Sequence, residues 1–388
     1  KGLLLSLTSP LLEVNNVYGG CRRADVIPDI ASQGLSEIPI MSGTVDGVSY
    51  SFPADLSAHI LITAGKINNV YGGNDISGKV DGGNGLDIRS SILGDVYGGG
   101  NGSYAYTDNP NLSTHRIYKD FYYEIPQGKT SAQALNDFRP NAEQAWISVS
   151  GASAQDPTVI GGSLYLGGNS ATLDIDPSEA DSKHASLNIG SYVIAKNVFL
   201  GSNGENMIDP SMMALYHNGT VDGQTFSGIR MTTDFAEYIK GVSVGIRPQI
   251  SFDDNYVDNS AKIGSLFFGG NLGSVTAGGT FDVEFAKPLV IFEKLVAGCN
   301  DANYINQSYG IDYTGGITTA PAQGDPKIRM TLNRITLMPG KLVNNDVVWN
   351  TTGDGDAKRL VGGNIFGGCY NSGIINGDVV INLTSAAY

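Results

Sequence analysis

A short motif recurs eight times along this 388-residue chain, and it constrains the fold more than any other feature. Each copy begins with an aliphatic residue, has an aromatic residue second in seven of the eight copies, and then contains glycine or similarly small residues. The copies are VYGGC (17–21), VYGGN (70–74), VYGGGN (96–101), LYLGGN (164–169), VFLGSN (198–203), LFFGGN (266–271), LVAGCN (295–300) and IFGGCY (365–370). Such repetition predicts an architecture in which each unit packs on its neighbours.

The shortest unit indicates what one repeat contains. Between Asn74 and Asn101 lie three runs, 77–81, 85–89 and 92–97, in which apolar and polar residues alternate as in half-buried strands. Three strands and three corners in 27 residues match one coil of a parallel β-helix. The middle strand is also predicted at 3–7, 60–63, 146–149, 186–189, 281–285, 328–332 and 379–383. We therefore predict an all-β chain, a right-handed parallel β-helix of about eight coils. It would form a single domain over 1–388 and, because both ends fall within a coil, a segment of a longer solenoid.

The columns of the motif have separate predicted roles. The aliphatic residues should form one continuous column in parallel strands: Val17, Val70, Val96, Leu164, Val198, Leu266, Leu295 and Ile365. The aromatic residues should stack as a structural ladder: Tyr18, Tyr71, Tyr97, Tyr165, Phe199, Phe267 and Phe366. An exposed sugar-binding stripe of Tyr18, Tyr71 and Tyr97 is the alternative. Glycines are expected to turn the chain with positive φ, and corner asparagines could hydrogen-bond from coil to coil.

The three cysteines, Cys21, Cys299 and Cys369, all lie in the corner motif. Buried free thiols are expected, with a bridge between Cys299 and Cys369 as the alternative. The sequence contains no CxxC pair and no Cys/His cluster, so neither a metal nor another cofactor is predicted.

Long gaps between corners predict loop insertions near 22–57, 102–144, 204–244, 301–325 and 339–360. The insertion at 102–144 is rich in tyrosine and should end in a short helix over 131–144. Its rings could form a platform for sugar rings, or only the small core of a long loop. The predicted ligand-binding residues are Tyr104, Tyr106, Tyr118, Tyr122 and Tyr123.

Charge and motifs exclude several functions. The formal net charge is −14, and an acidic surface repels phosphate backbones, so we expect no nucleic-acid partner. No apolar run is long enough for a membrane-spanning segment. Three carboxylate pairs, Asp174/Asp176, Asp253/Asp254 and Asp354/Asp356, lack a basic residue that we can match to them. We predict no catalytic residues, although a polysaccharide lyase or glycoside hydrolase on a pectate-lyase-like β-helix stays open as the alternative.

The phrases at 67–74 (INNVYGGN) and 93–101 (LGDVYGGGN) resemble large repetitive surface proteins of gut Bacteroidetes. Those proteins are described as adhesins with right-handed β-helices. The resemblance covers the repeat framework but not the insertions. It implies a non-enzymatic adhesin or glycan-binding protein at the outer cell surface, with host or microbial glycans or surface proteins as partners. It carries over no binding residues, because the shared motif is the scaffold corner.

Overall fold

The computed structural model describes residues 2–104, 138–173, 185–204, 261–273, 293–302 and 364–371 in full. It also describes residues 127, 128 and 373 and the backbone of the further strands named below. The complete regular elements within these residues are β-strands and one 3₁₀ turn, η1 (Ala31–Gln33), and Phe138 is a single helical residue. The chain is therefore all-β, as predicted.

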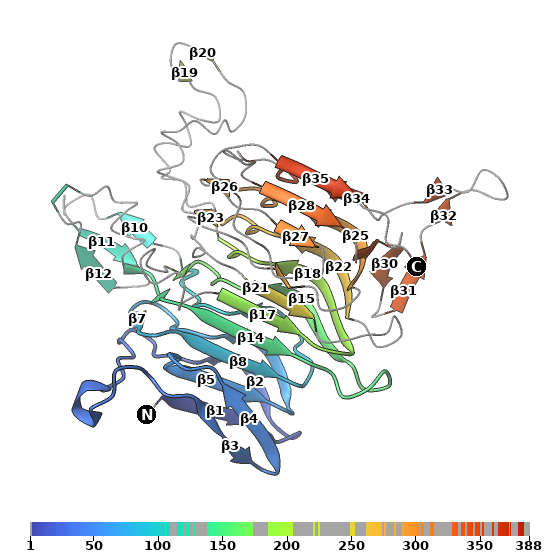
Figure 1. The fold of residues 1–388 in the computed structure, drawn as a ribbon. Helices are drawn as coiled ribbons and strands as arrows, with labels where there is room; N and C mark the ends of the chain where they lie inside the picture. Colours follow the sequence, from blue (N-terminus) through green and yellow to red (C-terminus); the bar gives the residue numbers. More distant parts are fainter. Residues whose placement is uncertain are drawn as a thin grey trace.

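Two long parallel sheets carry the fold, and successive strands stack along them in the order of the sequence (Figure 1). Sheet A consists of β1 (Leu3–Leu7), β5 (Ala58–Ile62), β8 (Asn84–Ile88), β14 (Ala145–Val149), β17 (Ala185–Ile189), β21 (Gln249–Phe252) and β24 (Val283–Glu284). Sheet B consists of β2 (Glu13–Tyr18), β6 (Lys66–Tyr71), β9 (Val96–Tyr97), β15 (Thr158–Tyr165), β18 (Val193–Phe199), β22 (Lys262–Phe267), β25 (Leu289–Val296), β29 (Ile335–Leu337) and β34 (Asn364–Phe366).

The chain visits these sheets in a repeating order. A third parallel sheet contains β7 (Lys79–Val80), β13 (Asn141–Ala142) and β16 (Thr172–Leu173). From β7 to β9 the chain passes from this third sheet to sheet A and then to sheet B, and from β13 to β15 it does so again. This order is compatible with the coils predicted from the shortest repeat.

The aliphatic column forms as predicted. Each of its eight residues pairs in a parallel strand with the next, from Val17 with Val70 through to Leu295 with Ile365. Val17, Val70, Val96, Leu164, Val198, Leu266 and Leu295 are buried in one core, against which Ile365 packs. The core is continuous because parallel in-register pairing superposes the same inward position of every copy.

The corner glycines correct one expectation. None of the described glycines at the fourth motif position has positive φ. They are instead needed because neighbouring backbones approach closely. A Cβ on Gly99 would lie 2.8 Å from the backbone nitrogen of Gly168, and one on Gly201 would lie 2.4 Å from that of Gly270. Positive φ occurs just after the motif, at Gly102 and Gly204.

The predicted insertions contain mostly antiparallel strands, at the periphery of the stacks (Figure 1). They form the hairpin β3 (Met41–Val45) and β4 (Val48–Phe52), the sheet β10 (Tyr106–Asp108), β11 (His115–Tyr118) and β12 (Phe121–Glu124), and the hairpins β19 (Thr220–Val221) with β20 (Gln224–Thr225), β30 (Gly340–Val343) with β31 (Asp346–Trp349), and β32 (Thr351–Thr352) with β33 (Arg359–Leu360).

Two ranges differ from their expected loop or helix structure. The range 301–325 contains β26 (Tyr304–Ile305) and β27 (Ile311–Tyr313), which pair in parallel with β23 (Val275–Thr276) and β28 (Ile328–Leu332); β28 in turn pairs with β35 (Val379–Leu383). Of the helix expected over 131–144, Phe138 is helical, but the prediction is wrong at its end, because Asn141 and Ala142 form β13. Pairing with β7 and β16 outweighs the local helical pattern there. Residues 129–137 lie outside the described residues.

Candidate functional site

The aromatic residues of the corners stack ring on ring along sheet B. Neighbouring centroids are 4.9 Å apart from Tyr18 to Phe199 and 4.5 Å apart between Phe199 and Phe267, with interplanar angles of 5–15°. The rings from Tyr71 to Phe267 are buried, so Tyr71 and Tyr97 offer no exposed face to a sugar. Burial raises the pKa of Tyr71 and of Tyr165 to about 12, because the phenolate would lose its hydration.

The stack is interrupted where the motif has Val296 instead of an aromatic residue. Tyr370 contacts the rings on both sides of this gap. Its ring lies edge-on to Phe267 at 6.2 Å and to Phe366 at 4.9 Å between centroids. The Lys294 ammonium lies 4.2 Å from the Tyr370 centroid, within the range of a cation–π contact.

A ladder of polar side chains follows the aromatic column, at the sixth motif position of the second to seventh copies and at the seventh position, Asn371, of the eighth copy. Each Asn donates from Nδ2 to the side-chain oxygen of the preceding ladder residue. The donor–acceptor pairs and distances are Asn101 to Asp75 (3.0 Å), Asn169 to Asn101 (3.0 Å), Asn203 to Asn169 (2.7 Å), Asn271 to Asn203 (2.8 Å), Asn300 to Asn271 (2.7 Å) and Asn371 to Asn300 (3.0 Å). The ladder thus has one direction, and its first residue needs only to accept.

The second copy does not align as its letters suggest. Asp75, not Asn74, occupies the ladder position, and its carboxylate accepts from Asn101. Asn74 lies one position earlier and is buried; its Oδ1 accepts from the Cys21 backbone N–H at 2.7 Å, and its Nδ2 donates to the carbonyl of Ser77. A carboxylate suits the first ladder position because it carries acceptors alone.

The three cysteines are free thiols, as predicted, but their burial differs. Cys299 is fully buried, whereas Cys21 and Cys369 are half-buried. Cys299 and Cys369 lie at equivalent positions of adjacent corners. A hydrogen bond from Cys299 lowers the pKa of the Cys369 thiol.

The tyrosines predicted to bind a ligand lie at two different places. Tyr104 is half-buried beside the ladder, where its hydroxyl donates to the Asp75 carboxylate. Burial raises its pKa to about 12. In the β10–β12 sheet, the backbone of Tyr106 pairs with Tyr118, and that of Tyr118 pairs with Phe121.

Two further candidates occupy the same sheet: Tyr122 pairs with Ile117 and Tyr123 pairs with Arg116. The side chains of Tyr106, Tyr118, Tyr122 and Tyr123 lie outside the described residues, as do the three predicted carboxylate pairs.

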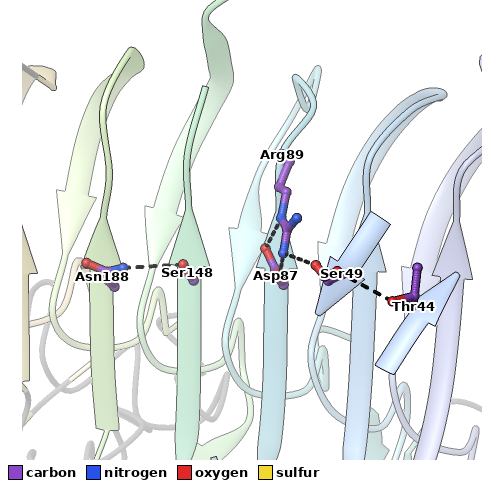
Figure 2. Close-up of polar contacts among 6 residues, drawn as sticks. All are labelled: Thr44, Ser49, Asp87, Arg89, Ser148 and Asn188. Atoms are coloured by element: carbon purple, nitrogen blue, oxygen red, sulfur yellow. Dashed lines mark hydrogen bonds and ion pairs between the residues drawn. The ribbon is translucent and has the colours of Figure 1, made fainter. Parts of the chain in front are cut away.

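A row of polar side chains crosses the outer face of sheet A and continues onto the β3–β4 hairpin (Figure 2). We call it the polar row, and it comprises Asn188 on β17, Ser148 on β14, Asp87 on β8, Ser49 on β4 and Thr44 on β3. The first three are direct register partners in neighbouring parallel strands. Asn188 Nδ2 donates to Ser148 Oγ at 3.4 Å, and the hydroxyls of Thr44 and Ser49 lie 3.4 Å apart.

Arg89 joins the two halves of the polar row (Figure 2). Its Nε donates to Asp87 Oδ1 at 3.0 Å and its Nη2 donates to Oδ2 at 2.6 Å. Nη2 also donates to the Ser49 carbonyl at 2.9 Å, so the same guanidinium ties the hairpin to β8. The hydrogen bond with Asp87 raises the pKa of Arg89. The charges of this pair cancel within the row.

Trp146 lies next to the polar row, where the hairpin meets the open part of sheet A. Phe52 of the hairpin and Leu56, which follows the hairpin, pack against Leu61 and cover the outer face of β5. Trp146 touches the edge of this cluster, with its ring 5.6 Å from that of Phe52 at 75°. Trp146 itself is half-buried, as are Ser148, Ser186 and Asn188. An aromatic ring and several hydroxyl and amide groups are therefore accessible together.

The polar row presents one ion pair among neutral hydroxyl and amide groups. Asp87 carries the carboxylate of the polar row as defined above. Its side chain is 8% exposed, and both of its carboxylate oxygens accept hydrogen bonds from Arg89. Most glycoside hydrolases use two carboxyl groups that flank the scissile bond. Across the described residues, no group of three potential metal ligands occurs either.

Sequence analysis missed the polar row although its strands were predicted. Ser148 and Asn188 alternate with buried residues in strands whose burial follows a strict period of two. When the segments 85–89, 146–149 and 186–189 are aligned in register, their outward positions show the polar residues of the row. What the sequence lacks is the register between strands that are separated by long insertions.

Comparison with protein-family models, curated proteins and solved structures finds no match to this chain. Among the residues that the structure describes, no helix has the length and hydropathy needed to cross a membrane.

Proposed function

We propose that this chain is a non-enzymatic, glycan-binding adhesin built on a right-handed parallel β-helix and presented at the outer cell surface. The observation that carries the proposal is the accessible Trp146 beside the polar row on sheet A. An indole ring can stack on the apolar face of a pyranose, and hydroxyl and amide side chains can bind its hydroxyl groups. A few convergent polar groups around an aromatic surface are typical of small-molecule sites.

The β-helix itself is supported by the order of the strands. The chain passes from the third sheet to sheet A and then to sheet B, and each strand pairs in parallel with its equivalent. Crossovers between parallel strands of one sheet are almost always right-handed. The outer-surface location is supported by the resemblance of the repeat to surface proteins of gut Bacteroidetes.

Glycan binding is tested with an array of purified glycans probed with the whole chain and with Trp146→Ala. We expect the chain to bind a subset of glycans and the variant to lose that binding. Trp146→Phe keeps an aromatic ring against Phe52, so it should retain part of the signal and shows whether loss in the alanine variant comes from a displaced hairpin. Asn68→Ala, an exposed asparagine on sheet B, is the matched control.

Two results would overturn the proposal. One is an absence of binding to every glycan by a folded chain. The other is turnover of a glycan into shorter or unsaturated products, which would favour the lyase or hydrolase alternative.

A further inference from the structure

We propose that the polar row binds an extended, neutral, β-1,4-linked glycan that lies across the strands of sheet A, with about one sugar unit per coil. The inference rests on the proposed glycan-binding function and specifies its ligand class, its site and its orientation. Three observations support it: the spacing of the row, its charge and the step formed by the hairpin.

The spacing follows from the register. Asp87, Ser148 and Asn188 are direct partners in adjacent parallel strands, so they are separated by the strand spacing of about 4.8 Å. This spacing is close to the length of one sugar unit in an extended β-1,4-linked chain. A glycan that runs across the strands therefore meets an equivalent side chain at every coil.

The charge of the row favours a neutral ligand. Arg89 is held on both oxygens of Asp87 and on the Ser49 carbonyl, so no net charge is presented there. The other members, Thr44, Ser49, Ser148 and Asn188, are neutral. The chain as a whole has a formal charge of −14, which repels an acidic polysaccharide over a longer range. Hydroxyl and amide groups both donate and accept hydrogen bonds, as sugar hydroxyls do.

The hairpin supplies direction. It covers the outer face at Leu61 and leaves Ser148 and Asn188 beyond its edge accessible. Trp146 lies at that edge. It is two residues before Ser148 on β14 and lies on the same face of the sheet. A sugar unit stacked on Trp146 would start a chain that continues over β14, β17 and the next two strands of sheet A, β21 and β24, away from the hairpin.

The test measures affinity by isothermal titration calorimetry with cellobiose, cellotetraose, cellohexaose, mannohexaose and hexagalacturonate. We expect a neutral hexasaccharide to bind, hexagalacturonate not to bind, and affinity to rise about two- to tenfold for each added unit up to four units, as expected for one additional hydrogen bond per coil. Ser148→Ala and Asn188→Ala should each weaken binding about two- to tenfold, whereas Asn68→Ala should leave it unchanged.

The outcomes separate this inference from the proposed function. Binding of hexagalacturonate in place of the neutral glycans would overturn the neutral-ligand inference but leave glycan binding intact. Neutral-glycan binding that Ser148→Ala and Asn188→Ala do not change would overturn the polar row as the site. Affinity that is the same for cellobiose and cellohexaose would overturn the orientation across the coils. Failure of every sugar here and on the array would overturn both proposals.

Discussion

Asn101 donates a 3.0 Å hydrogen bond to the carboxylate of Asp75, and this contact is the first step of a ladder that continues to Asn371. In every later step, too, the donor bonds to the ladder residue that precedes it in the sequence. The ladder consequently has a direction. An internal residue must both donate and accept a hydrogen bond, whereas the first residue only accepts. Substitutions within it should have effects that depend on their position.

Asn203→Ala should reduce the free energy of unfolding by about 1–3 kcal/mol, because it removes two amide hydrogen bonds and leaves Asn169 and Asn271 each without one. Asn371→Ala, at the exposed end with one such bond, should cost less than about 1 kcal/mol. Asn203→Asp should destabilise more at neutral pH than at pH 3, because an ionised carboxylate cannot donate to Asn169. Denaturant unfolding measures all three, and equal costs for Asn203→Ala and Asn371→Ala would contradict a continuous ladder.

Tyr370 should stabilise the end of the aromatic column. Tyr370→Ala removes ring contacts to Phe267 and Phe366, which are worth roughly 0.5–1.5 kcal/mol each. We expect a loss of about 1–3 kcal/mol, and a near-neutral effect of Tyr370→Phe, which keeps the ring. The midpoint of thermal unfolding provides the comparison; an unchanged midpoint for the alanine variant would show that the ring does not bridge the gap at Val296.

Alkaline pH should weaken the tyrosine stack. The folded-state pKa of Tyr71 and of Tyr165 is raised from 10.0 to about 12. Their contribution to stability is complete below pH 10 and is lost as pH rises through 12, because the unfolded state releases the phenolic proton first. Tyrosinate absorbance should show a late-titrating group of tyrosines that coincides with unfolding.

Tyr165→Phe should fold normally, since Phe199 and Phe267 already occupy this column, and should reduce that pH dependence. Titration of every tyrosine near pH 10 in the folded protein would contradict the burial of the stack.

The thiols should differ in reactivity. Without reductant, denatured protein should titrate three thiols, and native protein should expose Cys21 and Cys369 before Cys299. Cys369 is half-buried and its pKa is lowered by the hydrogen bond from Cys299, while Cys299 is fully buried. Cys369→Ser removes one fast-reacting thiol and identifies it. A single titratable thiol in the denatured protein would indicate a bridge between Cys299 and Cys369.

The repeat in the sequence determined the strands and their inward columns. Val17, Val70 and Val96 could be aligned from the motif alone because the strands of neighbouring copies pair in register, so equal motif positions superpose. The aromatic column follows for the same reason, as does the free state of the cysteines. These features depend on local pattern and on identity between copies, and both are visible in the letters of the chain.

Only the tertiary structure decided what depends on neighbours far apart in sequence. It assigned Asp75 rather than Asn74 to the ladder, because one residue of offset exchanges an inward and an outward side chain. It placed the Tyr370 ring in contact with Phe267 and Phe366, the rings on either side of Val296. It also showed that the corner glycines are needed for close backbone approach rather than for positive φ. It also brought Asp87, Ser148 and Asn188 into one row across strands separated by long insertions. Register between such strands is determined by packing of the whole stack, and no single segment of the sequence contains it.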